Sequence, residues 1–261
     1  MGAYVLCEAG LYAITRILLF ALSAGLFAVR IWEMVSKDTT TTTTFIHTDP
    51  FFAKSHTTNN LRFWDFFLYF ENWVLLVSLC YFLCAGIITL FAVCLPGAES
   101  PRAPWFVWIT WILHAALLPM TLVNAFAWLL VTEGRGAIGH SNSMIVDATC
   151  VYGSFIIVFF DAWINRQPYY ASFHGFIGFG TCITYLVFNI LYTVLGGEDE
   201  NGFNTIYPGT HWVKTDRQHW MTVGKLTYLE CMILIPMANL LYWCMLWARR
   251  RARVAAKQSA V

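Results

Sequence analysis

Long runs of apolar residues, separated by shorter polar segments, dominate this chain of 261 residues. Six of these runs are 21 residues or longer, and about 20 apolar residues are enough for an α-helix to cross a bilayer. We therefore expect an all-α polytopic membrane protein, a bundle of six transmembrane helices that forms one domain over residues 1–261. The predicted spans are Leu11–Trp32, Phe63–Leu95, Pro104–Val131, Met144–Ile164, Tyr170–Leu195 and Met221–Trp247.

The second predicted span is longer than a bilayer requires, because it covers 33 residues. Its first residues are rich in aromatic side chains, with Phe63, Trp64, Phe66 and Phe67 close together. Aromatic side chains favour the membrane–water interface, and a long span fits a bilayer by tilting. We therefore expect this aromatic start to lie at the interface, or the whole helix to tilt.

Composition supports the membrane interpretation and removes other classes of protein. Hydrophobic residues make up 58% of the chain and charged residues only 12%, whereas soluble domains have about 25% charged residues. So few charges cannot cover a soluble globule of this size, which excludes a soluble enzyme, a disordered chain and a nucleic-acid-binding protein. The net charge of +1 favours no charged partner. The expected partners are membrane lipids and, as a second class, other membrane proteins.

The cysteines and histidines predict neither a metal site nor a cofactor. Seven of the eight cysteines lie inside apolar segments, without the paired spacing of a zinc site or the loop positions of a disulfide framework. We expect them to be buried as small apolar side chains. Haem would need two histidines at one depth on facing helices, and His114, His140 and His174 are expected at different depths. Lys225 lies at the end of a span and no seventh span follows, which argues against a retinal protein.

Basic residues near the ends of the spans predict the orientation. Five of them, Arg249, Arg250, Arg251, Arg253 and Lys257, follow the last span. Because short cytoplasmic segments carry an excess of Lys and Arg, this tail predicts a cytoplasmic C-terminus, and six spans then place the N-terminus on the same side. The N-terminal segment lacks a basic leader and a small-residue cleavage site, so we expect it to remain attached. The sequence does not indicate which membrane the protein occupies.

Ionisable residues inside the spans are the first candidates for a site, since each costs several kcal/mol unless it is paired or solvated. Glu71, Asp147 and Glu230 all lie toward the non-cytoplasmic ends of their spans. Asp147 follows His140 by seven residues, which is two helical turns and about 10 Å. We expect these residues near one membrane face, together with Asn72, Asn142 and Tyr207. They form either a polar cavity for a substrate or hydrogen bonds that hold the helices together.

Other polar residues within the spans are expected to have structural roles. Arg16, Arg30 and Glu33 on the first span are expected to be paired or to extend toward the interface, with Arg30 and Glu33 three residues apart on one helix face. Asp161 and His174 flank a short loop that contains Arg166, and we expect pairing there. His114 lies near the middle of its span, and we expect a packed core histidine.

Several short motifs resemble the rolling stone family of multi-pass membrane proteins and, more distantly, the androgen-induced and androgen-dependent membrane hydrolases. Tyr69-Phe70-Glu71-Asn72-Trp73 is similar to the family pattern Tyr-Leu-Thr-Asn-Trp, and His140-Ser141-Asn142-Ser143 with Asp147 resembles its His-x-x-Asn-Ser…Asp stretch. Further matches are Tyr12-x-x-x-Arg16, Pro104-Trp105, Trp111-Ile112-Leu113, Tyr185-x-x-Phe188, Tyr192, Gly196-Gly197, Asp199, Gly202, Ile206-Tyr207-Pro208 and Trp212. The resemblance extends over nearly the whole chain.

The resemblance to the hydrolase branch implies cleavage of lipid esters, including fatty acid esters of hydroxy fatty acids. That chemistry uses an intramembrane threonine activated by a histidine. This chain has Glu71 at the position of the threonine, and the family histidine aligns with either His140 or Ser143. A carboxylate at this place can act as a general base for water with His140 as its partner. The alternative is a protein without hydrolase activity, a structural, adhesive or accessory subunit of a membrane complex.

Overall fold

The computed structural model describes residues 2–38, 63–94, 104–134, 142–164, 170–196, 206, 233 and 235–258. Its elements are all helices, so the expected all-α class is confirmed for these residues. The α-helices are α1 (Gly2–Asp38), α2 (Phe70–Cys94), α3 (Trp105–Gly134), α4 (Asn142–Ile164), α5 (Ala171–Val194) and α7 (Ile235–Gln258). A short 3-10 helix, η1 (Phe63–Leu68), precedes α2.

Five of the described helices are long and apolar enough to cross a membrane. The five segments are Gly10–Ser36, Phe70–Cys94, Trp105–Trp128, Ile145–Ile164 and Ser172–Val194, and they identify a multi-pass membrane architecture. Residues 221–232 and 234 of the sixth predicted span lie outside the described residues. Its second half belongs to α7, which continues past the predicted end at Trp247 as far as Gln258. The count of six spans therefore stays a prediction.

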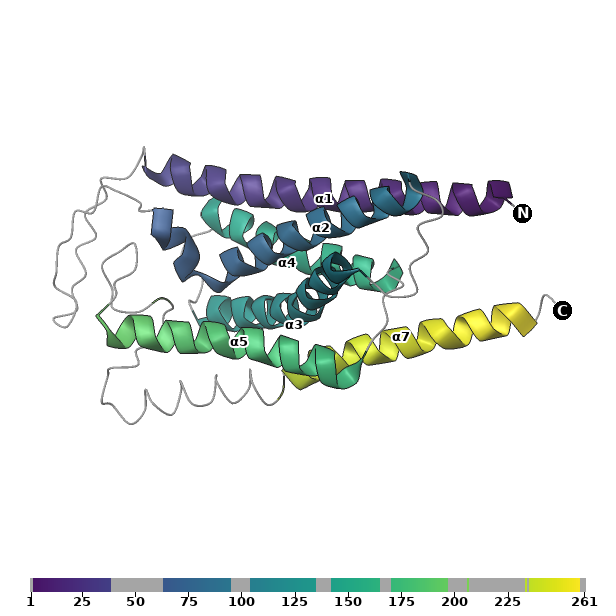
Figure 1. Ribbon diagram of the computed structural model, residues 1–261. Helices are drawn as coiled ribbons and strands as arrows, with labels where there is room; N and C mark the ends of the chain where they lie inside the picture. The colour runs from purple at the N-terminus through teal and green to yellow at the C-terminus, as the bar shows by residue number, and fades with distance from the viewer. Residues whose placement is uncertain are drawn as a thin grey trace.

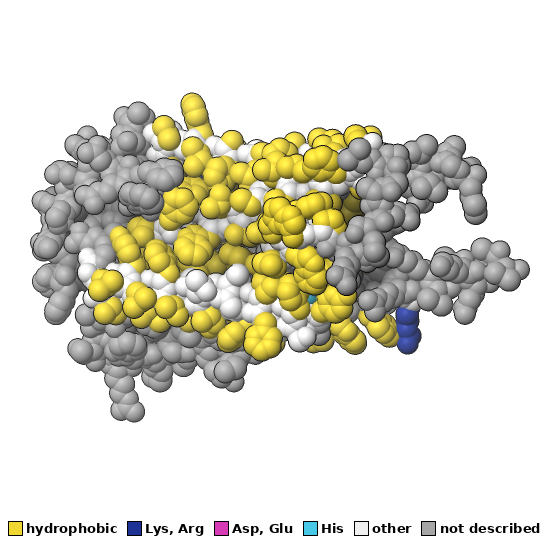
Figure 2. Space-filling model, in the orientation of Figure 1, with side chains coloured by type: hydrophobic (Ala, Val, Ile, Leu, Met, Phe, Trp, Pro, Cys, Tyr) yellow, Lys and Arg dark blue, Asp and Glu magenta, His cyan; other side chains and the backbone are white. Residues whose placement is uncertain are grey.

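The helices pack around α3, which contacts α2, α4, α5 and α7 (Figure 1). Residues 114–125 of α3 are all buried, whereas α1 contacts α2 and α4 at the edge of the bundle. The described surface between the two ends of the molecule is apolar, as a lipid-facing surface must be (Figure 2). The first residues of α1 and the last residues of α7 lie at the same end of the described helices (Figure 1).

The prediction of one continuous helix over the second span is wrong. The helical structure is interrupted at Tyr69, between η1 and α2. Backbone carbonyls at membrane depth need a partner, and side chains supply the partners here. Asn72 Nδ2 donates to the Phe66 carbonyl at 2.8 Å, and Trp73 Nε1 donates to the Phe67 carbonyl at 2.6 Å. Tyr185 Oη on α5 donates to the Leu68 carbonyl at 2.6 Å. These bonds stabilise the break and fix where α2 begins.

A proline in α3 and a glycine in α5 lie against each other. Pro119 is inside α3 and has no N–H, so the Ala115 carbonyl loses its normal helical hydrogen bond. A Cβ atom added to Gly178 would lie 2.5 Å from Pro119 Cγ and 3.3 Å from the Ala115 carbonyl oxygen. The contact between the two helices therefore requires a residue without a side chain at position 178.

Candidate functional site

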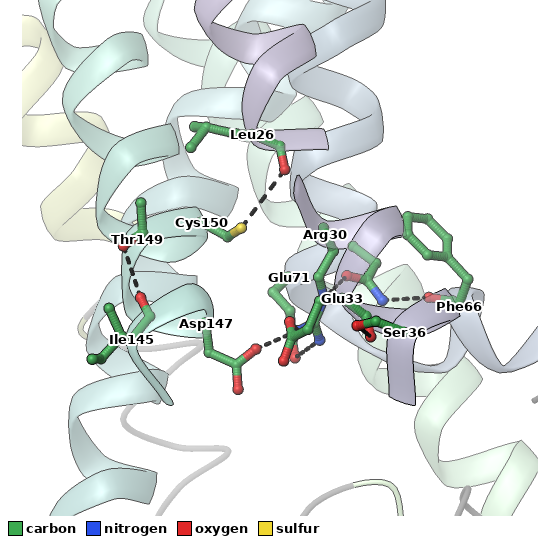
Figure 3. Close-up of polar contacts among 11 residues, drawn as sticks. Leu26, Arg30, Glu33, Ser36, Phe66, Glu71, Ile145, Asp147, Thr149 and Cys150 are labelled. Carbon is green, nitrogen blue, oxygen red and sulfur yellow. Dashed lines mark hydrogen bonds and ion pairs between the residues drawn. The ribbon is translucent and has the colours of Figure 1, made fainter. Parts of the chain in front are cut away.

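A cluster of charged side chains surrounds Arg30, near the end of α1 that faces η1 (Figure 3). Arg30 Nη1 donates to Glu33 Oε2 at 2.8 Å, and Arg30 Nη2 lies 3.4 Å from Glu71 Oε1. Arg30 Nη1 also forms an ion pair with Asp147, and Nε donates to Asn72 Oδ1 at 2.9 Å. The guanidinium offers five N–H donors in a fixed plane, and here they reach three helices, α1, α2 and α4. We call these five residues the Arg30 cluster.

The Arg30 cluster is buried at its centre and more open toward α4. The Arg30 and Glu33 side chains are each 9% exposed, compared with 18% for Glu71 and 29% for Asp147. An isolated charge at this depth is costly, and the cost falls when the charge is paired and hydrogen-bonded. The cluster therefore connects the three helices, and the carboxylates of Glu71 and Asp147 remain partly accessible.

A second ion pair lies about 21 Å along α1 from the first, since Arg16 and Arg30 are 14 residues apart. Arg16 forms an ion pair with Asp161 of α4, and both side chains are almost completely buried. Tyr81 Oη of α2 donates to Asp161 Oδ2 at 2.6 Å, and Arg16 donates to Tyr12 Oη at 2.5 Å. Arg16 lies in the apolar interior and needs an anion there, and Asp161 supplies it. Arg166 lies outside the described residues, so the expected pairing of Asp161 with Arg166 stays a prediction.

His114 of α3 lies beside this second ion pair, in the middle of the bundle. Its side chain is fully buried, and its ring centroid is 5.2 Å from those of Tyr81 and Tyr242. His114 Nδ1 lies 3.3 Å from Tyr242 Oη of α7, and Nε2 has no hydrogen-bond partner among the described residues. His114 is thus packed in the core, as expected from its position in the sequence.

His174 lies close to the same group of rings, but its hydrogen bond is to the residue before α5. Its Nδ1 is 2.9 Å from the carbonyl oxygen of Tyr170, the residue just before the helix. Its ring centroid is 6.1 Å from that of Tyr242. His114 and His174 therefore both contact Tyr242, although the sequence predicted different depths for them. No group of three His, Cys, Asp or Glu side chains suitable for a metal ion occurs in the described part of the chain.

Three of the seven predicted site residues come together in the structure. Glu71, Asn72 and Asp147 all bind Arg30, and Asn72 is fully buried with both ends of its amide bonded. Asn142 is the first residue of α4, but its side chain lies outside the described part of the chain. His140, Tyr207 and Glu230 also lie outside the described residues. The structure therefore tests neither the predicted His140 contact nor the predicted role of Glu230.

The sequence interpretation missed Arg30 as the centre of the cluster. It paired Arg30 with Glu33 on the same helix, and this pair is present. It did not connect Arg30 to α2 and α4, although an arginine inside an apolar run needs anions from other helices. The same signal identifies Arg16 and Asp161, which the sequence analysis treated as separate residues.

Comparison with known proteins finds no matching family model, no similar curated protein and no similar solved structure.

Proposed function

We propose that this protein is a non-catalytic integral membrane protein, an accessory or adhesive component of a membrane assembly. The Arg30 cluster supports this proposal. Glu71, which occupies the position of the nucleophile in the hydrolases that the sequence resembles, contacts Arg30 at 3.4 Å. A guanidinium at this distance stabilises the carboxylate anion, whereas a general base must accept a proton from water. In this proposal the main role of the cluster is to connect the helices.

Purification in mild detergent tests this proposal. We expect the protein to be isolated from its native membrane in a fixed stoichiometric ratio with a partner membrane protein, as measured by native mass spectrometry. We also expect the purified protein and its Glu71→Gln variant to show the same background rate on long-chain esters. Isolation as a single species together with ester hydrolysis that depends on Glu71 would overturn the proposal.

A second candidate function is a lipid-ester hydrolase of the kind found in the rolling stone-related branch. The partial exposure of Glu71 and Asp147 favours it, because a substrate must reach the reacting groups. In this proposal Glu71 and His140 are catalytic, and the substrate is a long-chain ester that enters from the bilayer. The substrate-binding residues are Asn72, Asn142, Asp147, Tyr207 and Glu230.

Variants of both catalytic candidates separate the two functions. The hydrolase proposal expects Glu71→Gln and His140→Ala each to reduce ester hydrolysis by at least about 10²-fold, the usual contribution of an acid–base group. Thr184→Ala serves as a control, because Thr184 is exposed on α5 and its hydroxyl donates to the Gly180 carbonyl of the same helix. Equal hydrolysis by the wild type and both variants would contradict the hydrolase function.

The membrane orientation is part of the same proposal. We propose cytoplasmic N- and C-termini on the basis of the basic tail after Trp247. Epitope tags at the two ends, probed in cells before and after permeabilisation, test this. Both tags should bind antibody only after permeabilisation of the membrane, and binding to either tag in intact cells would contradict the orientation.

A further inference from the structure

The last part of α7 continues beyond the apolar half of this helix. Residues 235–247 carry exposed apolar side chains, including Leu240, Trp243 and Trp247. The helix then runs without a break to Gln258. Tryptophan is enriched at the membrane–water interface, so Trp247 marks the level at which α7 leaves the hydrocarbon. Residues 248–258 therefore extend outward from that level as a helix.

This extension has a high and uncompensated positive charge. Five of the chain's 16 basic residues lie between positions 249 and 257, and the sequence has no Asp or Glu from position 231 to its last residue. In Figure 2, the described surface that is coloured as Lys or Arg lies only at this end of the molecule. Arg251 is exposed, and its guanidinium stacks over the Trp247 ring at 4.0 Å.

Four of the basic positions share one side of the helical backbone of α7. With about 100° of rotation per residue, positions 249, 250, 253 and 257 fall within an arc of about 100°. Position 251 lies outside this arc and close to position 247, consistent with its contact to Trp247. We call Arg249, Arg250, Arg253 and Lys257 the basic stripe.

We propose that the basic stripe of α7 binds the headgroups of anionic phospholipids at the membrane surface. A rise of 1.5 Å per residue places Arg249, Arg250 and Arg253 within about 9 Å of Trp247. That is about one Debye length at physiological salt, so these three arginines lie within the electrostatic range of the headgroups. Each basic residue immediately after a membrane span raises the affinity for anionic lipids by about fivefold.

Binding of a fluorescent phosphatidylserine to the full-length protein in neutral detergent tests the proposal. We expect phosphatidylserine to bind more tightly than phosphatidylcholine, with an affinity that falls as salt is added. The triple variant Arg249→Gln, Arg250→Gln and Arg253→Gln should weaken phosphatidylserine binding by about 10²-fold. Equal affinity for the two lipids, or unchanged binding by the triple variant, would overturn the proposal.

Two controls make the result specific to the stripe. The variant Lys54→Gln, Arg62→Gln and Arg135→Gln removes the same charge from the connections after α1 and α3, and it should bind phosphatidylserine like the wild type. Equal weakening in this variant would show a general charge effect and would overturn the proposal. A polyglutamate peptide should compete poorly with the lipid. If the peptide binds more tightly than the lipid, the ligand of the stripe is an acidic protein and the proposal is overturned.

Discussion

Arg30 on α1 and Asp147 on α4 form an ion pair across 117 residues of sequence. The contact lies at the edge of the buried part of the bundle, where Asp147 is 29% exposed. Arg30 also contacts two other carboxylates and one amide, so its cation is shared among groups from three helices. The stability of α1 against its neighbours should therefore depend more on Arg30 than on any one of the acids.

The substitution Arg30→Met tests this dependence. It removes the cation and leaves Glu33, Glu71 and Asp147 close together, so we expect the free energy of unfolding to fall by about 3–5 kcal/mol. Thermal unfolding in detergent measures the change. Arg30→Lys is the control, since it keeps the charge but loses the planar set of donors, and it should cost less. Equal stability of the wild type and Arg30→Met would contradict the role of the cluster.

A double-mutant cycle tests the second ion pair. Arg16→Met and Asp161→Leu each remove one member of the ion pair and leave the other charge buried, and each should lower the free energy of unfolding by about 3–5 kcal/mol. The double variant should recover much of this loss, because both charges are then absent. Chemical unfolding of the four proteins gives the coupling energy. Additive losses in the double variant would show that the two residues do not depend on each other.

The helix break at Tyr69 predicts a specific cost for losing one hydroxyl group. Tyr185→Phe keeps the ring against Phe70 and Trp73 but leaves the Leu68 carbonyl without its donor. We expect a loss of about 1–3 kcal/mol in the free energy of unfolding. Tyr152→Phe is a matched control, because the described contact of Tyr152 is through its ring with Trp128. A loss of the same size in both variants would contradict the role of the hydrogen bond.

The contact between α3 and α5 predicts different results for two glycine substitutions. Gly178→Ala places a methyl group against Pro119 and should lower the free energy of unfolding by about 1–3 kcal/mol. Gly180→Ala meets no atom within 4 Å and should be neutral or slightly stabilising, because alanine favours helix. Melting temperatures of the two variants in one detergent make the comparison. Equal melting temperatures would contradict the close approach at Gly178.

Helix positions were the most predictable part of the structure. Apolar runs placed the ends of α4 and α5 within two residues of those observed, because a bilayer imposes a minimum length on each span. The break at Tyr69 was not predictable in the same way. It depends on the bond from Tyr185 to Leu68, two residues that are 117 positions apart in sequence, and an apolar pattern contains no information about such a contact.

The candidate site was predictable in its location but not in its organisation. Counting from the ends of the spans predicted Glu71 and Asp147 at similar depth, because helical rise converts position into depth, and both residues contact Arg30. The pattern could not show that Arg30 joins them, since that depends on which way α1 faces. The contacts of Arg16 with Asp161 and of His114 with Tyr242 could not be predicted for the same reason, because they depend on how each helix is rotated about its axis.

The ion pair between Arg16 and Asp161 has a consequence for how the protein enters the membrane. Asp161 is synthesised 145 residues after Arg16, which takes about 7–30 s at 5–20 residues per second. During this delay α1 carries a cation whose carboxylate partner has not yet been made, so release of α1 alone into lipid is unfavourable. Membrane insertion of α1 is therefore expected to finish only after α4 has emerged, which makes the order of synthesis part of the route to the folded protein.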